Sequence, residues 1–369
     1  MSNVVTILMT LAASNAIAVG AAPTRFTPGN IFVAEPHISA CFQVTEEFPG
    51  DRIWEINPRT GQASVFAEFY FEDCAYITGL AISPDGTRLR AASAAHDTIF
   101  EFAPDGTRRE PLTGKNGILW PVGQNSIAFD SWGHFFVANG GLQQILEFGQ
   151  NDNGPRILAD VEDNITRGQI GVSAGSSLYF AKTDPVGQDD RVFHVDTQSG
   201  EVSVFDEYGF TLTGIAIDEF DTLYVALLNG KIFRYKHADV ATKTLIAQLS
   251  GGVTITVAHS PGVIYAANVG EVKAIDSLTG EVTVIAADFG AGGVCCGIAV
   301  VPPAAVPAVG GWALLVMVLV IVGVYSLMQI REVQDTHLLP TRIGATTLLV
   351  SSRLGVLQVS LNAPCAHVV

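Results

Sequence analysis

The chain has 369 residues, of which 48% are hydrophobic and 15% are charged, and its 36 acidic and 20 basic residues give a net charge of −16. This length suits one large domain or two of ordinary size. The acidic balance excludes nucleic-acid binding, because contacts to phosphates need a basic surface.

Residues 1–22 have the features of a secretory signal peptide. Val4–Ala13 is an apolar stretch, and Ala16–Ala18 and Gly20–Ala22 provide small-residue cleavage sites behind it. The segment departs from the usual pattern in one respect, since no basic residue precedes Arg25. We expect residues 1–22 to be removed on export.

A unit of four short apolar segments then recurs six times. The first segments of the units are marked by Gly79, Ser126, Ile170, Gly214, Ile255 and Gly297, at steps of 47, 44, 44, 41 and 42 residues. The second segments are "IFVAE" (31–35), "LRAAS" (89–93), "FFVAN" (135–139), "LYFAK" (178–182), "LYVAL" (223–227) and "IYAAN" (264–268). Third and fourth segments follow, as in "RVFHVDTQSG" (191–200) and "EVSVFDEY" (201–208).

This pattern predicts an all-β fold, a six-bladed β-propeller over residues 23–303. Four strands per unit of about 40–50 residues, joined by turns with glycine, are typical of propeller blades. The first copy starts at a second strand, and "GIAVV" (297–301) is left over after the sixth. We therefore predict that this last strand completes the first blade and closes the ring, which removes an exposed sheet edge.

The repeats resemble six-bladed propellers of the NHL-repeat and gluconolactonase (regucalcin)-like type. Gluconolactonase-like enzymes hold a divalent metal with one Glu, two Asn-like residues and one Asp at the entrances of the innermost strands, so the resemblance implies a Ca²⁺ or Zn²⁺ site there. The corresponding positions are Thr78, Asn125, Gln169, Thr213, Thr254 and Cys296. Only Asn125 matches in type, and none is a carboxylate. Metal-dependent hydrolysis, with Asn125 as a ligand, is therefore the alternative hypothesis.

A ligand-binding face is expected where the innermost strands begin and the second strands end. The second strands end in mostly polar residues, with two histidines just beyond; these are either a proton-handling or metal-binding group or solvated loop residues. Two long insertions, 36–51 and 183–190, lie on the same face and suit recognition. The candidates are Glu35, His37, Thr78, His96, Asn125, Asn139, Gln169, Lys182, Thr213 and Asn268.

Four cysteines map to this same face: Cys41, Cys74, Cys295 and Cys296. In an exported domain they predict two disulfides. One possible pairing is Cys41–Cys74 together with Cys295–Cys296. In another pairing, Cys41 or Cys74 bonds to the closing strand. Free thiols are the alternative.

The C-terminal part predicts a membrane anchor. A Pro/Gly/Ala linker (304–311) precedes 19 uncharged, mostly apolar residues (312–330), enough for one transmembrane helix, and Arg331 follows directly. A buried core helix is the alternative. Val306, Pro307 and Trp312 resemble IPTL-type C-terminal sorting signals, which implies the surface of a Gram-negative bacterium. The tail (331–369) has no clear periodicity.

These features predict an exported, membrane-anchored propeller with a monomeric ectodomain. We expect it to bind a small molecule or a protein without catalysis. A spacer role at the cell surface is a further hypothesis. "GVSAG" (171–175) fits a serine-nucleophile motif, but that motif needs a strand-to-helix turn, and a strand-to-strand hairpin is expected here.

Overall fold

The computed structural model divides the chain into two compact units, Met1–Ala304 and Ala305–Val369. The described residues are 23–36, 50–69, 75–95, 98–113, 126–140, 142–149, 155–161, 170–173, 175, 177–182, 190–257, 262–268, 270–289 and 297–303, together with the backbone of 346–352 and 355–361.

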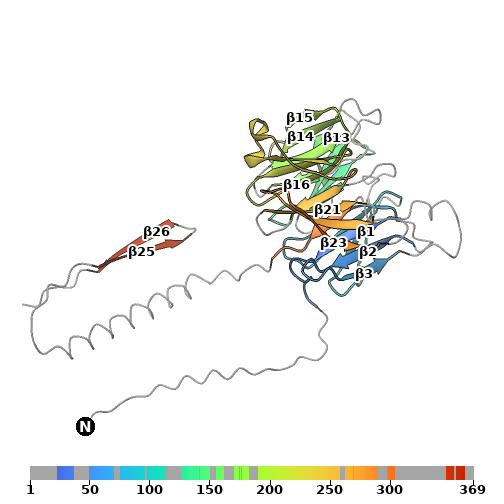
Figure 1. The fold of residues 1–369 in the computed structure, drawn as a ribbon, viewed down its shortest axis with the longest axis horizontal. Helices are drawn as coiled ribbons and strands as arrows, with labels where there is room; N and C mark the ends of the chain where they lie inside the picture. Colours follow the sequence, from blue (N-terminus) through green and yellow to red (C-terminus); the bar gives the residue numbers. More distant parts are fainter. Residues whose placement is uncertain are drawn as a thin grey trace, which may run out of the picture. The chain divides into compact units, whose positions relative to one another are not determined.

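The first unit contains six antiparallel four-stranded sheets, the blades, named here from the innermost strand outward (Figure 1). Blade 1 contains β24 (Ile298–Val300), β1 (Ile31–Glu35), β2 (Arg52–Ile56) and β3 (Ala63–Glu68). Blade 2 contains β4 (Ile77–Ile82), β5 (Leu89–Ser93), β6 (Thr98–Phe102) and β7 (Leu112–Thr113). Blade 3 contains β8 (Ser126–Phe129), β9 (Phe135–Asn139), β10 (Gln144–Phe148) and β11 (Pro155–Asp160).

The other three blades repeat this plan. Blade 4 contains β12 (Ile170–Val172), β13 (Ser177–Lys182), β14 (Asp190–Asp196) and β15 (Val202–Tyr208). Blade 5 contains β16 (Leu212–Ile217), β17 (Leu223–Leu227), β18 (Lys231–Tyr235) and β19 (Thr244–Gln248), with the 3₁₀-helices η3 (Lys236–Ala238) and η4 (Val240–Thr242) before β19. Blade 6 contains β20 (Thr254–Val257), β21 (Val263–Asn268), β22 (Glu271–Asp276) and β23 (Val282–Ala287).

The innermost strands form a closed ring. Contacts run from β24 to β4 and then through β8, β12, β16 and β20 back to β24. The structure therefore confirms the predicted six-bladed β-propeller, with each sheet formed by one copy of the sequence repeat.

The predicted closure of the ring is also confirmed. β24 pairs antiparallel with β1, with Ile31 opposite Val300 and Val33 opposite Ile298. Beyond the paired strands, Gly29 N–H donates to the Val301 carbonyl at 3.0 Å, and Ala34 N–H donates to the Gly297 carbonyl at 2.9 Å. The two ends of the propeller sequence thus share one sheet, and Figure 1 shows β1 and β2 beside β23.

The second strand of each blade is apolar throughout because both of its faces are buried. In β17, Tyr224 and Ala226 pack in the cluster shared with blade 6, whereas Leu223 and Val225 pack in the cluster shared with blade 4. Successive side chains of a strand point to opposite faces, so a strand between two neighbours needs apolar residues at every position.

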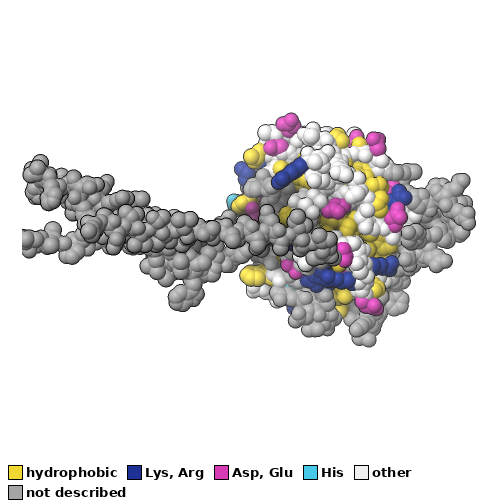
Figure 2. Space-filling model, turned by 90° about the horizontal axis from the view of Figure 1, so that it is seen from below, with side chains coloured by type: hydrophobic (Ala, Val, Ile, Leu, Met, Phe, Trp, Pro, Cys, Tyr) yellow, Lys and Arg dark blue, Asp and Glu magenta, His cyan; other side chains and the backbone are white. Residues whose placement is uncertain are grey.

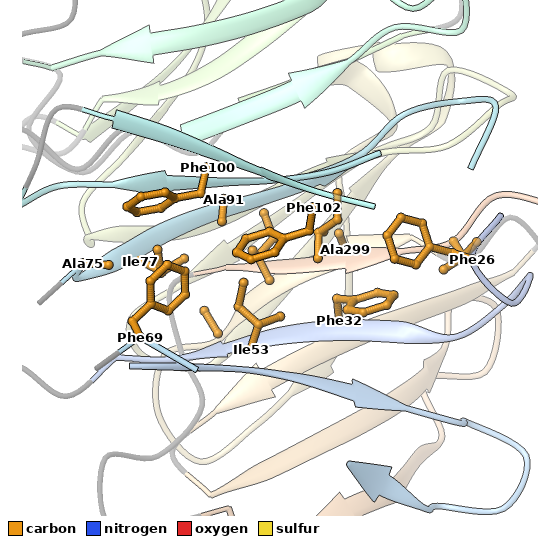
Figure 3. Packing of buried hydrophobic residues seen from close by; sticks show 14 residues of the cluster. Phe26, Phe32, Ile53, Phe69, Ala75, Ile77, Ala91, Phe100, Phe102 and Ala299 are labelled. Carbon is orange, nitrogen blue, oxygen red and sulfur yellow. The ribbon is translucent and has the colours of Figure 1, made fainter. Parts of the chain in front are cut away.

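The described core consists of six clusters, one between each pair of adjacent blades. In the cluster between blades 1 and 2, phenylalanine rings of the two blades pack together, and the Phe69 ring lies 5.0 Å from that of Phe100 in blade 2 (Figure 3). The Phe32 ring lies 5.2 Å from that of Phe26 and 5.0 Å from that of Phe66, both edge to face. Edge-to-face contacts between aromatic rings stabilise the fold beyond the burial of their apolar area.

Outer strands carry a bulge that shapes contact with the next blade. In blades 1, 3, 4, 5 and 6 one residue of the outer strand is left without a partner on the third strand; these residues are Phe66, Leu158, Phe205, Ile246 and Ile285. The carbonyl of Leu158 faces Gly200 in the outer turn of blade 4, and the carbonyl of Ile246 faces Gly280 in the same turn of blade 6. A Cβ atom at either glycine would overlap that oxygen.

The second unit contains an antiparallel hairpin of β25 (Thr346–Ser352) and β26 (Gly355–Leu361), within the tail for which the sequence showed no clear periodicity. Among the described residues, no helix is long and apolar enough to cross a membrane. The transmembrane helix predicted at 312–330, the linker before it and the sorting-signal residues lie outside the described residues.

Candidate binding face

All innermost strands begin, and all second strands end, on one face of the propeller, named here the entrance face. This follows from the antiparallel pairing in each blade: Ile77, at the start of β4, lies opposite Ser93 at the end of β5, and Leu212 lies opposite Leu227 in blade 5. The strands that flank a connection between blades, or one between a second and a third strand, therefore have those ends on this face. The other strand ends lie on the opposite face.

The described strand-end candidates are held within the blades. Glu35 is fully buried, and its Oε2 accepts a hydrogen bond of 2.7 Å from Trp54 Nε1. Ser93 Oγ donates to the Ala75 carbonyl, and Asn268 Nδ2 donates to the Ser250 carbonyl at 2.9 Å. The latter two bonds secure the connections that enter blades 2 and 6.

Two further candidates lie in the same ring. Asn139 is fully buried, and its Oδ1 accepts from Leu142 N–H at 3.2 Å in the following turn. Lys182 is 8% exposed and lies opposite Arg191, whose Nε is 3.2 Å from Glu207 Oε1. Among the described strand-end residues, Glu35 and Asn139 are thus buried and hydrogen-bonded within their blades, and Asn139 and Asn268 bond to the backbone of connecting turns.

Threonines at the entrances of blades 2 and 5 occupy equivalent bulges. Thr78 lies in the register shift between Ile77 and Gly79, and Thr213 lies in the one between Leu212 and Gly214. Bulges of this kind redirect a side chain out of the regular pleat. The Thr213 hydroxyl is buried and forms no hydrogen bond with the described residues. It is therefore a buried polar atom without a hydrogen-bond partner among the described residues, next to the start of β16.

The remaining predicted residues lie outside the part of the chain that the structure describes. They are His37, His96, Asn125, Gln169 and the cysteines Cys41, Cys74, Cys295 and Cys296. The metal site at Asn125 and the disulfides therefore stay predictions. At the described entrances, Thr78, Thr213 and Thr254 present hydroxyl groups, which do not fit the carboxylate-rich ligand set of a Ca²⁺ or Zn²⁺ site. The described residues contain no group of three or more His, Cys, Asp or Glu that could hold a metal.

The central channel is narrow, and most of the side chains that line it are apolar. Its cavity has a volume of about 170 Å³ and is lined by the six innermost strands, with Ser126 and Thr256 as its polar side chains and no charged one. The innermost strands approach each other closely: a Cβ at Gly214 would lie 2.9 Å from Ile255 N. Pockets for small ligands usually measure about 300–1,000 Å³, so the channel itself suits little more than water.

An exposed apolar pair lies beside the channel mouth on the entrance face. Phe210, in the connection into blade 5, is 55% exposed, and Leu228, in the next turn on this face, is 54% exposed. They are neighbours, because Leu228 N–H donates to the carbonyl of Thr211 at 2.7 Å. A Cβ at Gly252 would lie 2.9 Å from Leu228 Cδ1 and 3.0 Å from Thr213 Cγ2, so both side chains pack on Gly252.

No pattern in the sequence marks Phe210 and Leu228 as a pair. Each residue is a single apolar side chain inside a turn, in "YGFTLTG" (208–214) and "ALLNGK" (226–231), and single apolar residues are common on protein surfaces. Only the hydrogen bond between the two turns brings them together.

No family model matches the chain, and no curated protein matches it. Solved structures do. A chain in the crystal structure of a nidogen/laminin complex has a TM-score of 0.59 at 14% identity, covering 74% of this chain and 98% of the other. A putative TolB from Agrobacterium tumefaciens has a TM-score of 0.53 at 13% identity, covering 73% of this chain and 93% of the other.

At these identities the likeness extends to the fold alone. It agrees with the six-bladed ring seen here, since each match covers nearly the whole of the other chain. The NHL-repeat and gluconolactonase-like type and the sorting signal stay predictions.

Proposed function

We propose that this protein is a non-catalytic binding module that holds a protein partner against its entrance face. The observation that carries the proposal is the pair Phe210 and Leu228, two large apolar side chains more than half exposed at the channel mouth. Aromatic and aliphatic anchors surrounded by polar groups are typical of the centre of protein interfaces.

The surroundings of the pair support recognition rather than catalysis. The buried polar residues nearest the strand ends, such as Glu35 and Asn139, are already bonded to other parts of the blades. The methyl group of Thr213 and the side chain of Leu228 both pack on Gly252, which holds Leu228 in place on this face. A rigid scaffold with two exposed apolar anchors is suited to binding a protein.

The similar propeller in the nidogen/laminin complex supports a partner of the protein class, since that fold occurs there in a protein complex. We extend that role to this chain as part of the proposal. The low-identity match carries no information about which surface is used, so the entrance face rests on Phe210 and Leu228.

Two charge-reversing variants and one matched control test the face. Phe210→Asp and Leu228→Asp place a carboxylate on the entrance face, whereas Phe220→Asp changes a phenylalanine of similar exposure, 51%, on the opposite face of the same blade. Tagged full-length chains are crosslinked in cells, and any recovered partner is then purified and its affinity measured.

We expect the partner to bind the unmodified chain and Phe220→Asp equally well. Its affinity for Phe210→Asp and for Leu228→Asp should be at least about 30-fold lower, because residues at the centre of an interface contribute about 2 kcal/mol each. Loss of binding in Phe220→Asp alone would place the interface on the opposite face and contradict the proposal. A purified partner with equal affinity for all four chains would also contradict it.

Metal analysis separates this proposal from the metal-dependent hydrolase. After exhaustive dialysis of the full-length protein, mass spectrometry is expected to show well under one Ca²⁺ or Zn²⁺ per chain. One retained ion per chain, lost in Asn125→Ala, would favour the hydrolase and the predicted site at Asn125.

We further propose that the propeller lies outside the cytoplasm, anchored by residues 312–330. The support is the apolar sequence at 4–13 and at 312–330 and the four cysteines that the sequence predicts for one face of the propeller. Protease added to cells whose outer membrane has been permeabilised should cleave the propeller and leave a membrane-bound C-terminal fragment. Complete protection until the inner membrane is lysed would overturn this localisation.

A further inference from the structure

A second cavity lies on the opposite face, where the ring is closed. It has a volume of about 400 Å³, and we name it the closure pocket. Its walls come from residues 27–30 before β1, residues 57–59 in the outer turn of blade 1, Tyr265 of blade 6, and the chain after β24 up to Pro303. Both ends of the propeller sequence therefore line it. Its volume is within the range of small-ligand sites.

The charge of the closure pocket is unusual for this chain. Its described lining residues include one cation, Arg59, and no aspartate or glutamate, although the chain has 36 acidic and 20 basic residues. The Arg59 side chain is exposed and forms no hydrogen bond or ion pair with the described residues. On the face shown in Figure 2, acidic and basic side chains are interspersed.

Two neutral donors accompany Arg59. The Asn57 Oδ1 atom accepts from Arg59 N–H at 2.9 Å, and its amide nitrogen donates to none of the described residues. The hydroxyl of Tyr265 is half-buried and has no hydrogen-bond partner among them, and burial raises its pKa, so it stays protonated. A guanidinium, an amide and a phenol without acceptors thus line one pocket.

The rest of the lining is apolar or already bonded. Pro28, Pro58, Pro303 and Val300 supply apolar walls, and Asn30 Nδ2 donates to Glu55 Oε1 at 2.7 Å, so the Asn30 amide is already bonded. A ligand that satisfies this site needs an anion with two acceptor oxygens and a compact apolar body. A carboxylate matches the planar fork of an arginine, which donates two parallel hydrogen bonds to it.

We propose that the closure pocket binds the carboxylate of a compact apolar ligand, with Arg59 forming the ion pair and Asn57 and Tyr265 donating hydrogen bonds. This site is separate from the entrance face and does not depend on the function proposed for that face. The same chemistry is found in free aromatic or aliphatic acids and in the C-terminal carboxylate of a peptide.

Occupancy of the closure pocket also has a consequence for the ring. Because the pocket is built from residues on both sides of the β1–β24 pair, it exists only when the ring is closed. A ligand that binds the closed ring and not the unfolded chain raises the unfolding temperature.

The test uses the full-length protein in detergent, so that the chain after Pro303 is present. The probes are benzoate, hexanoate and an acetylated tripeptide ending in proline with a free C-terminus, each beside its neutral amide. The unfolding temperature and the affinity by calorimetry are measured for the unmodified protein and for Arg59→Gln, Tyr265→Phe and Lys236→Gln. Lys236 is an exposed base in η3, outside the pocket, and provides the matched loss of one positive charge.

We expect at least one carboxylate to raise the unfolding temperature in a saturable way, and its amide to have no effect. Arg59→Gln should weaken binding at least about tenfold, the effect of one charge-assisted hydrogen bond, while Lys236→Gln binds normally. Binding of free acids alone assigns a small acid, and binding of the peptide alone assigns a chain terminus. If no carboxylate binds, or if Arg59→Gln binds as well as the unmodified protein, the proposal is wrong.

Discussion

Arg90 has the largest fully buried side chain among the described residues, and its charge is matched inside the fold. Its Nε and one terminal nitrogen donate to Glu101 Oε2 at 3.0 and 2.9 Å, and Arg109 contacts Glu101 Oε1 at 3.0 Å. The guanidinium lies 4.4 Å from the centre of the Phe135 ring, so the ion pair of blade 2 packs on blade 3.

Glu101→Gln is expected to destabilise the propeller by about 3 kcal/mol, because it leaves Arg90 buried without its counter-charge. The free energy of unfolding in urea measures this. The control is Glu68→Gln, whose pair with Arg52 spans 3.0 Å with side chains 41% and 25% exposed. The control should cost under about 1 kcal/mol, and equal losses would show that Arg90 does not depend on Glu101.

Asp206 connects the outer strand of blade 4 to blade 5. Its Oδ2 accepts from Tyr235 Oη at 2.6 Å and from Lys243 Nζ at 2.7 Å. Burial opposes its ionisation, but these hydrogen bonds and the Lys243 charge outweigh burial and hold the pKa of Asp206 below its ordinary value.

This shift gives the stability a defined dependence on pH. A carboxyl with a lower pKa in the folded state contributes stability above its unfolded pKa of about 3.9, and loses it as the pH falls through the folded value. Asp206→Asn should therefore flatten the loss of stability below about pH 4, as measured by unfolding temperature. Glu219→Gln, at an exposed carboxylate without a hydrogen bond to the described residues, should keep the slope of the unmodified protein.

At the scale of elements, the outer turns and outer strands of adjacent blades fit together through glycine. Gly280 has a φ of +76°, and a Cβ there would overlap the bulged Ile246 carbonyl of blade 5. Gly270, in the same blade, has a φ of +82° with nothing within 4 Å of its Cβ position. Both positions need a left-handed backbone conformation. Only at Gly280 does an atom of the neighbouring blade lie close to the Cβ position.

We expect Gly280→Ala to cost roughly 2–5 kcal/mol, the sum of left-handed backbone strain and overpacking, and Gly270→Ala to cost about 1–2 kcal/mol from the backbone alone. Gly200→Ala should resemble Gly280→Ala, because Leu158 presents the same carbonyl to it. Chemical denaturation of the three variants measures this, and equal costs would show that the bulge adds nothing.

At the scale of the whole molecule, stability depends on the single strand that joins the ends. β24 covers the edge of β1, and Ile298, Ala299 and Val300 belong to two of the inter-blade clusters. A ring without it exposes a sheet edge and opens both clusters.

A chain that ends at residue 296 should therefore lose cooperative unfolding, whereas one that ends at residue 304 should keep it. Thermal unfolding followed by circular dichroism measures this. Addition of a peptide of residues 297–303 should partly restore the transition of the shorter chain, since β24 pairs through its backbone. A shorter chain that is as stable as the longer one would show that the closure does not hold the ring.

The sequence determined the blade plan because burial on two faces leaves a signature along the chain. The predicted second strands at 31–35, 89–93, 135–139 and 223–227 coincide with β1, β5, β9 and β17. Regular spacing and glycine turns set the number of blades, and the unpaired copy at 297–301 determined the closure. These features are local, or repeat at a fixed interval.

Only the tertiary structure decided which residues come together at the two proposed binding surfaces. The pairing of Phe210 with Leu228 depends on a hydrogen bond between two turns, and the closure pocket joins residues 27–30 to 300–303. Likewise, Glu35 and Asn139 proved to be buried and bonded within blades, although at the end of a strand they resemble exposed loop residues. The physical reason is that exposure and hydrogen bonding depend on neighbours distant in sequence, whereas strand patterning depends on neighbours two residues away.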